Sequence, residues 1–122
     1  NWLTYDNNCG EWRPNSQNFQ DSKDGTPMSV FAENVANAHG ESPSDFVRED
    51  GIWAGWFLAA IPAGWMRELG QSVYLDPANQ APNDTYQSHA AVQGPKDKKI
   101  RPRIGEKYEW VIPPPNRYDL PE

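Results

Sequence analysis

The chain has 122 residues, of which 37% are hydrophobic and 23% charged, and its formal net charge is −6 at pH 7. This length fits one domain, and the six Trp, five Tyr and four Phe residues supply enough apolar surface for a packed core. No apolar run approaches the roughly 18 residues that a membrane-spanning helix needs. We therefore expect a soluble protein without a membrane partner.

Cysteine and histidine content argues against a metal centre. Cys9 is the only cysteine, so it cannot form an intrachain disulfide, and a lone cysteine with two distant histidines does not make a zinc site. We expect a reduced thiol, a cytoplasmic location, and neither a metal ion nor another cofactor.

The first 25 residues predict an irregular N-terminal arm, because they are rich in Asn, Asp, Ser and Gly and show no sustained periodicity. Its aromatic residues suggest two alternatives: the arm wraps the core, or it contacts a ligand or partner. The stretch WRPNSQNF contains Arg13, held by a following proline, and then a hydroxyl and amides. This group resembles a pocket more than any other outside the core, so Arg13 and Ser16 are candidate binding residues.

Two helices are expected after the arm. The first is predicted over 27–39, because Thr26 is a good N-cap, a proline follows it, and Gly40 can end the helix. Its apolar residues recur at spacings of three and four: Met28, Phe31, Val35 and Ala38. The second helix is short. Ser42 and Asp45 begin it as a near capping box, and it ends before residue 51.

About four strands complete the expected fold. The almost wholly apolar residues 52–61 suit a central strand buried on both faces, although periodicity alone also allows a buried helix. A helical turn over 63–69 follows. The other strands are predicted at 71–76, 86–93 and 108–114.

The predicted fold class is therefore α+β: a single compact domain over residues 1–122, with two N-terminal helices followed by a mixed or antiparallel sheet of about four strands. The core is expected to contain apolar residues of the first helix and of the two most hydrophobic strands: Phe31, Val35, Trp53, Phe57, Ile61 and Val73.

Charge is unevenly distributed along the chain. Residues 96–107 hold six of the eleven basic residues and two acids, a balance of +4, so the remainder holds five basic and fifteen acidic residues, a balance of −10. The predicted cationic loop offers Lys98, Lys99, Arg101 and Arg103 as candidate binding residues that could contact phosphates. The alternative is a solvated loop folded back on the acidic body. The overall acidity argues against nonspecific binding to duplex nucleic acid.

The sequence YQSHAAVQG at 86–94 places a histidine on a predicted strand. Ser88 and His89 point to opposite faces of that strand, so they cannot form a nucleophile–base pair. His89 could instead work with Asp76, Arg67 and Arg13 in a catalytic set. The other interpretation is a structural histidine whose hydrogen bond goes to a carboxylate or a backbone oxygen.

Two functions are compatible with these patterns. The favoured hypothesis is a small binding or accessory domain that engages a macromolecular partner through the N-terminal arm and residues 96–107. That partner is expected to be a protein, with nucleic acid or a nucleotide as the alternative. The second hypothesis is a small nucleotide- or nucleic-acid-directed enzyme, a transferase or nuclease of the toxin or effector type, built around His89.

Overall fold

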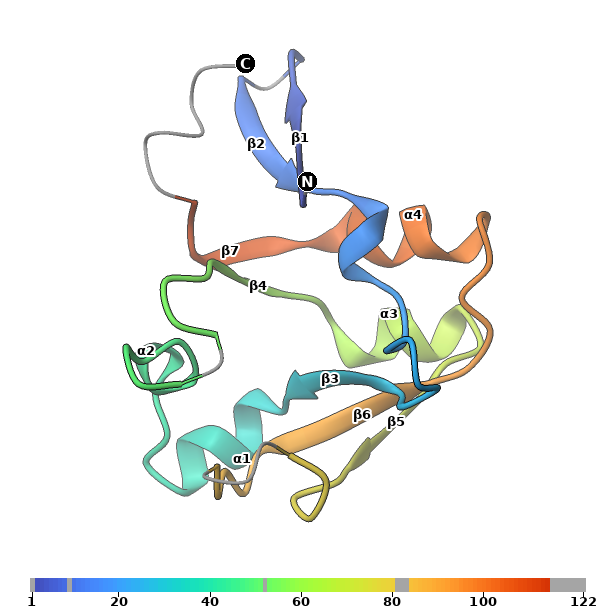
Figure 1. Cartoon of the computed structure of the whole chain (residues 1–122). Helices are drawn as coiled ribbons and strands as arrows, with labels where there is room; N and C mark the ends of the chain where they lie inside the picture. Colours follow the sequence, from blue (N-terminus) through green and yellow to red (C-terminus); the bar gives the residue numbers. More distant parts are fainter. Residues whose placement is uncertain (1, 9, 52, 81–83, 115–122) are drawn as a thin grey trace.

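The computed structural model describes residues 2–8, 10–51, 53–80 and 84–114, so the predicted state of Cys9 lies outside it. The described chain is mixed α and β with three antiparallel sheets, ordered β1-β2, β3-β6-β5 and β4-β7 (Figure 1). The strands are β1 (Leu3–Asp6), β2 (Glu11–Pro14), β3 (Met28–Phe31), β4 (Leu58–Ala60), β5 (Ser72–Leu75), β6 (His89–Gln93) and β7 (Glu109–Ile112). The helices are α1 (Glu33–Ala38), α2 (Pro43–Phe46), α3 (Ala63–Glu68) and α4 (Ile100–Ile104), with short 3₁₀ turns η1 (Ser16–Asn18) and η2 (Gly105–Lys107). Within these ranges, no helix has the length and apolar character needed to cross a membrane.

The best-buried part of the molecule is the sheet centred on β6. Val92 lies opposite Met28 of β3 and Val73 of β5, so these three residues share one face of the sheet. Helices α3 and α4 contribute Met66 and Ile104 to the same face. The buried residues of this aliphatic core are Phe19, Met28, Met66, Leu69, Val92 and Ile104.

The expectation of two N-terminal helices is wrong. Residues 28–31 form strand β3, and α1 has only six residues. Alternation explains the strand, because Met28 and Val30 pack on the core while the residues between them face away. The pairing of β3 with β6 therefore overrides the helical spacing. The end of α1 agrees with prediction, since Gly40 has a φ of +69°. The capping box at Ser42 is also present, on a helix of four residues.

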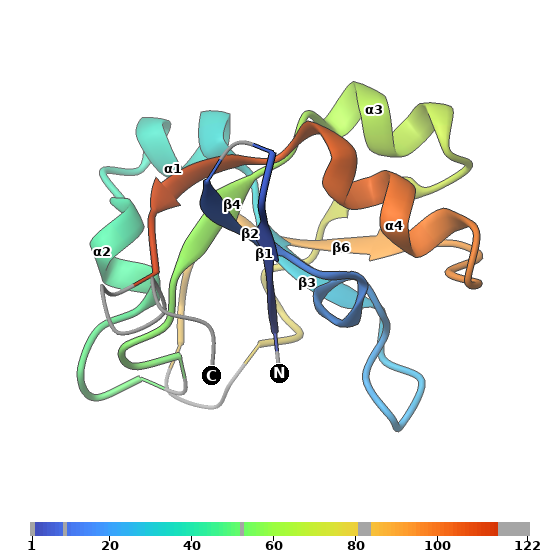
Figure 2. The same cartoon turned by 90° about the horizontal axis from the view of Figure 1, so that it is seen from above.

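The second part of the fold is an aromatic layer. It lies where the β1–β2 hairpin packs over β4 and β7, as Figures 1 and 2 show from two directions. Trp110 of β7 donates its indole N–H to the backbone oxygen of Trp12 at 2.9 Å. The Trp2 and Trp56 rings lie 5.5 Å apart, and Phe57 lies 5.6 Å from Trp110. The members of the layer are Trp2, Tyr5, Trp12, Trp53, Trp56, Phe57, Tyr108 and Trp110.

The apolar run at 52–61 does not form a long buried strand. Of the described residues 53–61, only Leu58–Ala60 is strand; it pairs with β7, and all three of its residues are half-buried. Trp53 lies in a turn and is 38% exposed. The glycine at 55, with a φ of +74°, bends the chain before a strand can begin. The other five predicted core residues are half-buried rather than buried: Phe31, Val35, Phe57, Ile61 and Val73.

Two segments that were expected to be irregular have regular structure. The N-terminal arm contains the β1–β2 hairpin, in which Thr4 lies opposite Arg13 and Tyr5 opposite Trp12. The predicted cationic loop contains α4 and η2. The Asp97 carboxylate accepts the backbone N–H groups of Lys99 and Ile100 at 2.9 Å each and so fixes the turn that leads into α4. The completely buried Ile104 anchors the helix.

Candidate functional site

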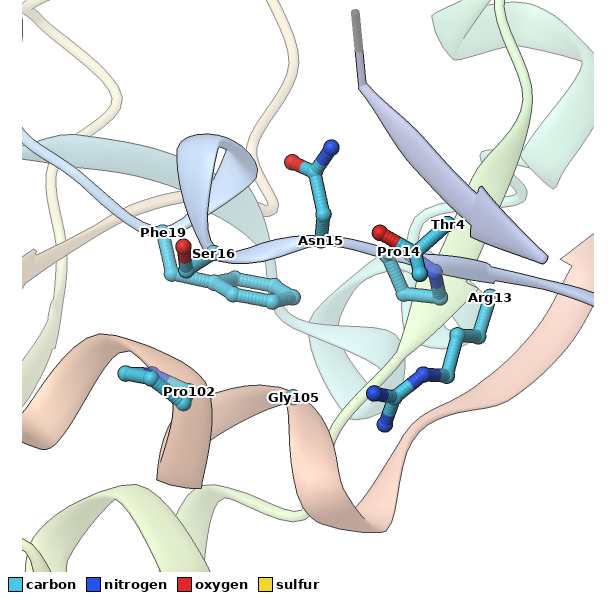
Figure 3. A pocket seen from close by; sticks show the side chains of 8 residues that line it. All are labelled: Thr4, Arg13, Pro14, Asn15, Ser16, Phe19, Pro102 and Gly105. Carbon is cyan, nitrogen blue, oxygen red and sulfur yellow. The ribbon is translucent and has the colours of Figure 1, made fainter. Parts of the chain in front are cut away.

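A cleft of about 200 Å³ separates the N-terminal arm from the α4–η2 segment. Its lining comes from two regions far apart in the sequence, as Figure 3 shows. The arm contributes Arg13 and Ser16, the two residues that the sequence indicates as pocket-like, and the α4–η2 segment contributes Pro102 and Gly105. The full lining is Thr4, Arg13, Pro14, Asn15, Ser16, Phe19, Pro102 and Gly105.

Local hydrogen bonds and one close contact hold the arm in place. Asn15 caps η1 by accepting the N–H of Gln17 at 3.0 Å, and Asn18 donates to the backbone oxygen of Trp2 at 2.7 Å. Phe19 is buried against η2 at the floor of the cleft. A Cβ atom added at Gly105 would lie 2.6 Å from Phe19 Cε2, so this position requires glycine.

Arg13 carries the positive charge of the cleft. It lies on β2 with an exposed side chain, and its guanidinium extends toward the α4–η2 segment (Figure 3). It makes no hydrogen bond or ion pair with any of the residues described. Because a guanidinium offers five N–H donors in a planar fork, Arg13 can receive a carboxylate or a phosphate. The hydroxyl of Ser16 supplies a further hydrogen-bonding group in the same cleft.

Four of the six cations at 96–107 have internal side-chain contacts, and three of them contact an acid, a backbone oxygen or an aromatic ring. Lys96 has a side chain only 5% exposed and donates to Asp21 Oδ1 at 2.7 Å and to the backbone oxygen of Val92 at 2.8 Å. Arg103 and Lys107 lie over the ring of Trp65, with 5.3 Å and 4.4 Å between charge and ring centroid. These three residues tie the cationic segment to the rest of the protein, as the folded-back alternative predicts for part of it.

The other three cations are two lysines and the half-buried Arg101, which also has an internal contact. Lys98 and Lys99 are exposed, and their ammonium groups make no ion pair within the described ranges. Arg101 Nη1 donates to Gln20 of the arm at 3.2 Å, and its Nε is buried without an acceptor from the described residues. Hydrogen bonds from the N–H groups of Ile100 and Lys99 lower the pKa of Asp97, so this carboxylate stays ionised beside them at neutral pH.

The proposed catalytic set around His89 does not converge. His89 is 5% exposed and packs edge-on against Phe31 at 5.9 Å. Asp76 does contact it, but through its backbone oxygen, which lies 2.6 Å from His89 Nδ1, whereas the Asp76 carboxylate accepts from Asn79. Arg67 Nη2 donates to a backbone oxygen of β5 at 3.4 Å. Arg13 lines the cleft, and His89 does not.

Ser88 has a partner that sequence patterns did not indicate. Its hydroxyl donates to Glu41 Oε1 at 2.6 Å, and the same carboxylate accepts the N–H groups of Gln87 and Ser88. Desolvation opposes ionisation, but these hydrogen bonds outweigh it and lower the pKa of Glu41. Because the two residues lie 47 positions apart, no local pattern could have paired them.

A second polar network surrounds Arg48. Its guanidinium contacts Asp84 Oδ1 at 2.6 Å, Asp50 Oδ1 at 2.8 Å and the hydroxyl of Tyr86. Desolvation raises the pKa of Tyr86, although the neighbouring Arg48 acts in the opposite direction. The Tyr86 hydroxyl in turn donates to the backbone oxygen of Asp45 at 2.6 Å. This network joins α2 to the chain before β6 and has a structural role.

Groups of three or more metal-ligating side chains are absent from the part of the chain that the structure describes. A comparison of the chain with protein-family models, curated proteins and solved structures found no match. No role is therefore carried over from a relative. The functional interpretation depends on the cleft, on its guanidinium without a partner among the described residues, and on the exposed lysines that precede α4.

Proposed function

We propose that the protein is a small binding domain that recognises an acidic segment of a partner protein in the cleft between the N-terminal arm and the cationic segment. The observation that carries this proposal is the position of Arg13 and Ser16 opposite α4 in one cleft. The exposed Lys98 and Lys99 precede α4 and extend the positive surface. An acidic side chain in the cleft would satisfy Arg13, and neighbouring acidic residues would interact with the lysines.

Binding is favoured over catalysis because the candidate catalytic residues are separated or already engaged. A general acid or base must reach a substrate, and His89 is buried with its Nδ1 at a backbone oxygen. Ser88 is completely buried and hydrogen-bonded to Glu41. These contacts support structural roles for both residues.

A protein partner is favoured over nucleic acid by the charge distribution. Four of the six cations at 96–107 make internal contacts, and the whole chain carries −6. A polyanion would gain contacts with few free cations while the acidic body repels it. A short acidic segment bound in one cleft avoids most of this repulsion.

The test measures binding of a short peptide that carries a pair of glutamate residues, and of a single-stranded DNA oligonucleotide, by fluorescence titration at low and moderate salt. The peptide should bind at low salt, and Arg13→Gln should weaken its binding about 10-fold, as the loss of one charge-assisted hydrogen bond implies. Replacing both Lys98 and Lys99 by Gln should reduce the salt dependence of binding. Lys23→Gln is the matched control, since Lys23 is an exposed cation of the arm that does not line the cleft.

Two results would contradict the proposal. One is the absence of peptide binding to the unmodified protein at low salt. The other is unchanged binding by the Arg13 variant, which would place the contact elsewhere. Binding of the oligonucleotide without the peptide would replace the protein partner by nucleic acid.

A further inference from the structure

Strand β5 forms an open edge of the β3-β6-β5 sheet. Within the described residues it pairs only with β6, and Figure 1 shows it on the outer side of that strand. Its sequence, SVYL, contains no charged residue. Tyr74 is 41% exposed and Leu75 is 52% exposed. The edge therefore presents apolar side chains next to backbone groups.

The pairing with β6 shows which backbone groups are free. Asp76 donates its N–H to the backbone oxygen of His89 at 2.8 Å, so its backbone faces β6. In an antiparallel pair, hydrogen-bonded and non-hydrogen-bonded residues alternate, so the backbone of Tyr74 also faces β6. Val73 and Leu75 then direct their N–H and C=O groups to the open edge. The bond from Arg67 Nη2 to the Val73 oxygen, at 3.4 Å, agrees independently with this direction.

The edge has little protection against pairing with another strand. Natural edge strands commonly carry lysine, proline or a bulge, or are covered by another element. Strand β5 contains neither lysine nor proline. The bond from Arg67 covers one of its carbonyl groups, that of Val73. Within the described part of the chain, the N–H groups of Val73 and Leu75 have no acceptor and can donate to another strand.

We propose that β5 mediates homodimerisation by pairing antiparallel with β5 of a second copy. In this arrangement Val73 lies opposite Leu75 of the partner subunit, and each residue offers one N–H and one C=O to the other. The Val73 oxygen accepts this bond through its second lone pair, because Arg67 occupies only one. Tyr74 lies at the two-fold axis. A symmetric pairing is closed, so it joins two copies without forming a filament.

Charge and geometry favour a second copy over an unrelated peptide. Arg67 contacts the strand near its beginning, and Asp76 follows its end. Antiparallel pairing brings the Arg67 end of each strand toward the Asp76 end of the other, so opposite charges approach at both ends. The strand has four residues, so the interface is small and we expect a weak dimer that dissociates on dilution.

Two measurements test the dimer. Sedimentation of the full chain from roughly 5 µM to roughly 500 µM should show a monomer converting to a dimer. Amide hydrogen exchange at the two extremes should show concentration-dependent protection of Val73 and Leu75. The Tyr74 amide, which faces β6, should be protected at both concentrations and is the internal control.

A variant localises the contact. Leu75→Lys places a charge on the edge and should raise the dimer dissociation constant by at least about 10-fold. Val111→Lys is the matched control, because Val111 of β7 is also an exposed apolar strand residue, at 41%. Three results would each overturn the proposal. The protein could stay monomeric throughout the concentration range, or the dimer could survive in the Leu75 variant. The third result is amide exchange at Val73 and Leu75 that does not depend on concentration.

Discussion

The aliphatic core beneath β6 and the aromatic layer around β7 differ in how completely they bury their side chains. Val92 and Ile104 of the core have no exposed surface, whereas Trp2 and Trp53 of the aromatic layer are 41% and 38% exposed. The core is covered by α3 and α4, while the aromatic layer is covered only by a two-stranded hairpin. Rings are large enough to bury much surface even when their outer parts meet water.

This difference bears on function. Around β6, polar groups such as His89, Ser88 and Lys96 are buried and have protein partners. Along the arm, Arg13 faces a cleft with no partner among the described residues. A ligand can gain a hydrogen bond only from a group that is not already satisfied. The well-packed core therefore provides stability, and the less covered side of the molecule provides the candidate binding site.

The contrast between the buried aliphatic core and the partly exposed aromatic layer is tested most strongly by Ile104→Ala. This change removes a fully buried side chain that the surrounding helices and sheet cannot easily replace, so we expect a loss of about 2–5 kcal/mol in the free energy of unfolding. Chemical denaturation monitored by circular dichroism measures it. A loss below about 1 kcal/mol would show that Ile104 is not in a rigid core.

Phe57→Ala tests the aromatic layer in the same way. Because Phe57 is half-buried, we expect a loss of about 1–3 kcal/mol, less than full burial of the ring would imply. Tryptophan fluorescence should also change, since Phe57 lies 6.0 Å from the Trp56 ring. Equal losses in the Phe57 and Ile104 variants would mean that the aromatic layer is a second complete core.

Local signals predicted several elements close to their observed ranges. Pro62 and Gly70 bracket α3, and apolar residues indicate β5, β6 and β7, all close to their expected ranges. Strand β3 was missed because the positions of Met28 and Phe31 suit a helix as well as a strand. Pairing with β6 decides between them, and β6 lies far along the chain.

The sequence predicted the residues of one wall of the cleft. The pattern WRPNSQNF identified Arg13 and Ser16, which do line it. The opposite wall could not be predicted, because it depends on contacts such as that between Gln20 and Arg101, which are 81 positions apart. The separation of Arg13 from the buried His89 likewise follows from the tertiary fold rather than from any local pattern.

Glu41→Gln should have a smaller, pH-dependent effect. The folded protein lowers the pKa of Glu41 below its ordinary value of 4.5, so its ionised form stabilises the fold. That contribution is fully present above the unfolded pKa and is lost as the pH falls through the lower, folded pKa. At pH 7 the variant should lose about 1 kcal/mol, because the amide has no charge and offers one acceptor oxygen where the carboxylate uses two, while the partial exposure of the carboxylate limits the loss.

Unfolding curves recorded from pH 7 to pH 3 measure this effect. The difference between the variant and the unmodified protein should decrease once the pH falls below about 4.5, where the unfolded carboxylate becomes protonated. Ser88→Ala is a useful companion, since it removes one of the donors and should raise the pKa of Glu41. A difference that is constant with pH would show that the ionised carboxylate is not responsible.

The smallest effect is expected for His89→Gln, which separates a structural histidine from a catalytic one. The imidazole Nδ1 faces the backbone oxygen of Asp76 at 2.6 Å, and a glutamine amide can donate to the same oxygen. The variant loses the edge-on contact with Phe31, so we expect a loss below about 1 kcal/mol in the free energy of unfolding and unchanged binding at the cleft. His39→Gln is the control, because His39 ends α1 at an exposed position. Thermal unfolding and the peptide titration measure both properties. A different result would be loss of an enzymatic activity in the His89 variant alone, with an unchanged melting temperature. It would assign His89 a chemical role, and the functional region would then be the buried sheet rather than the cleft.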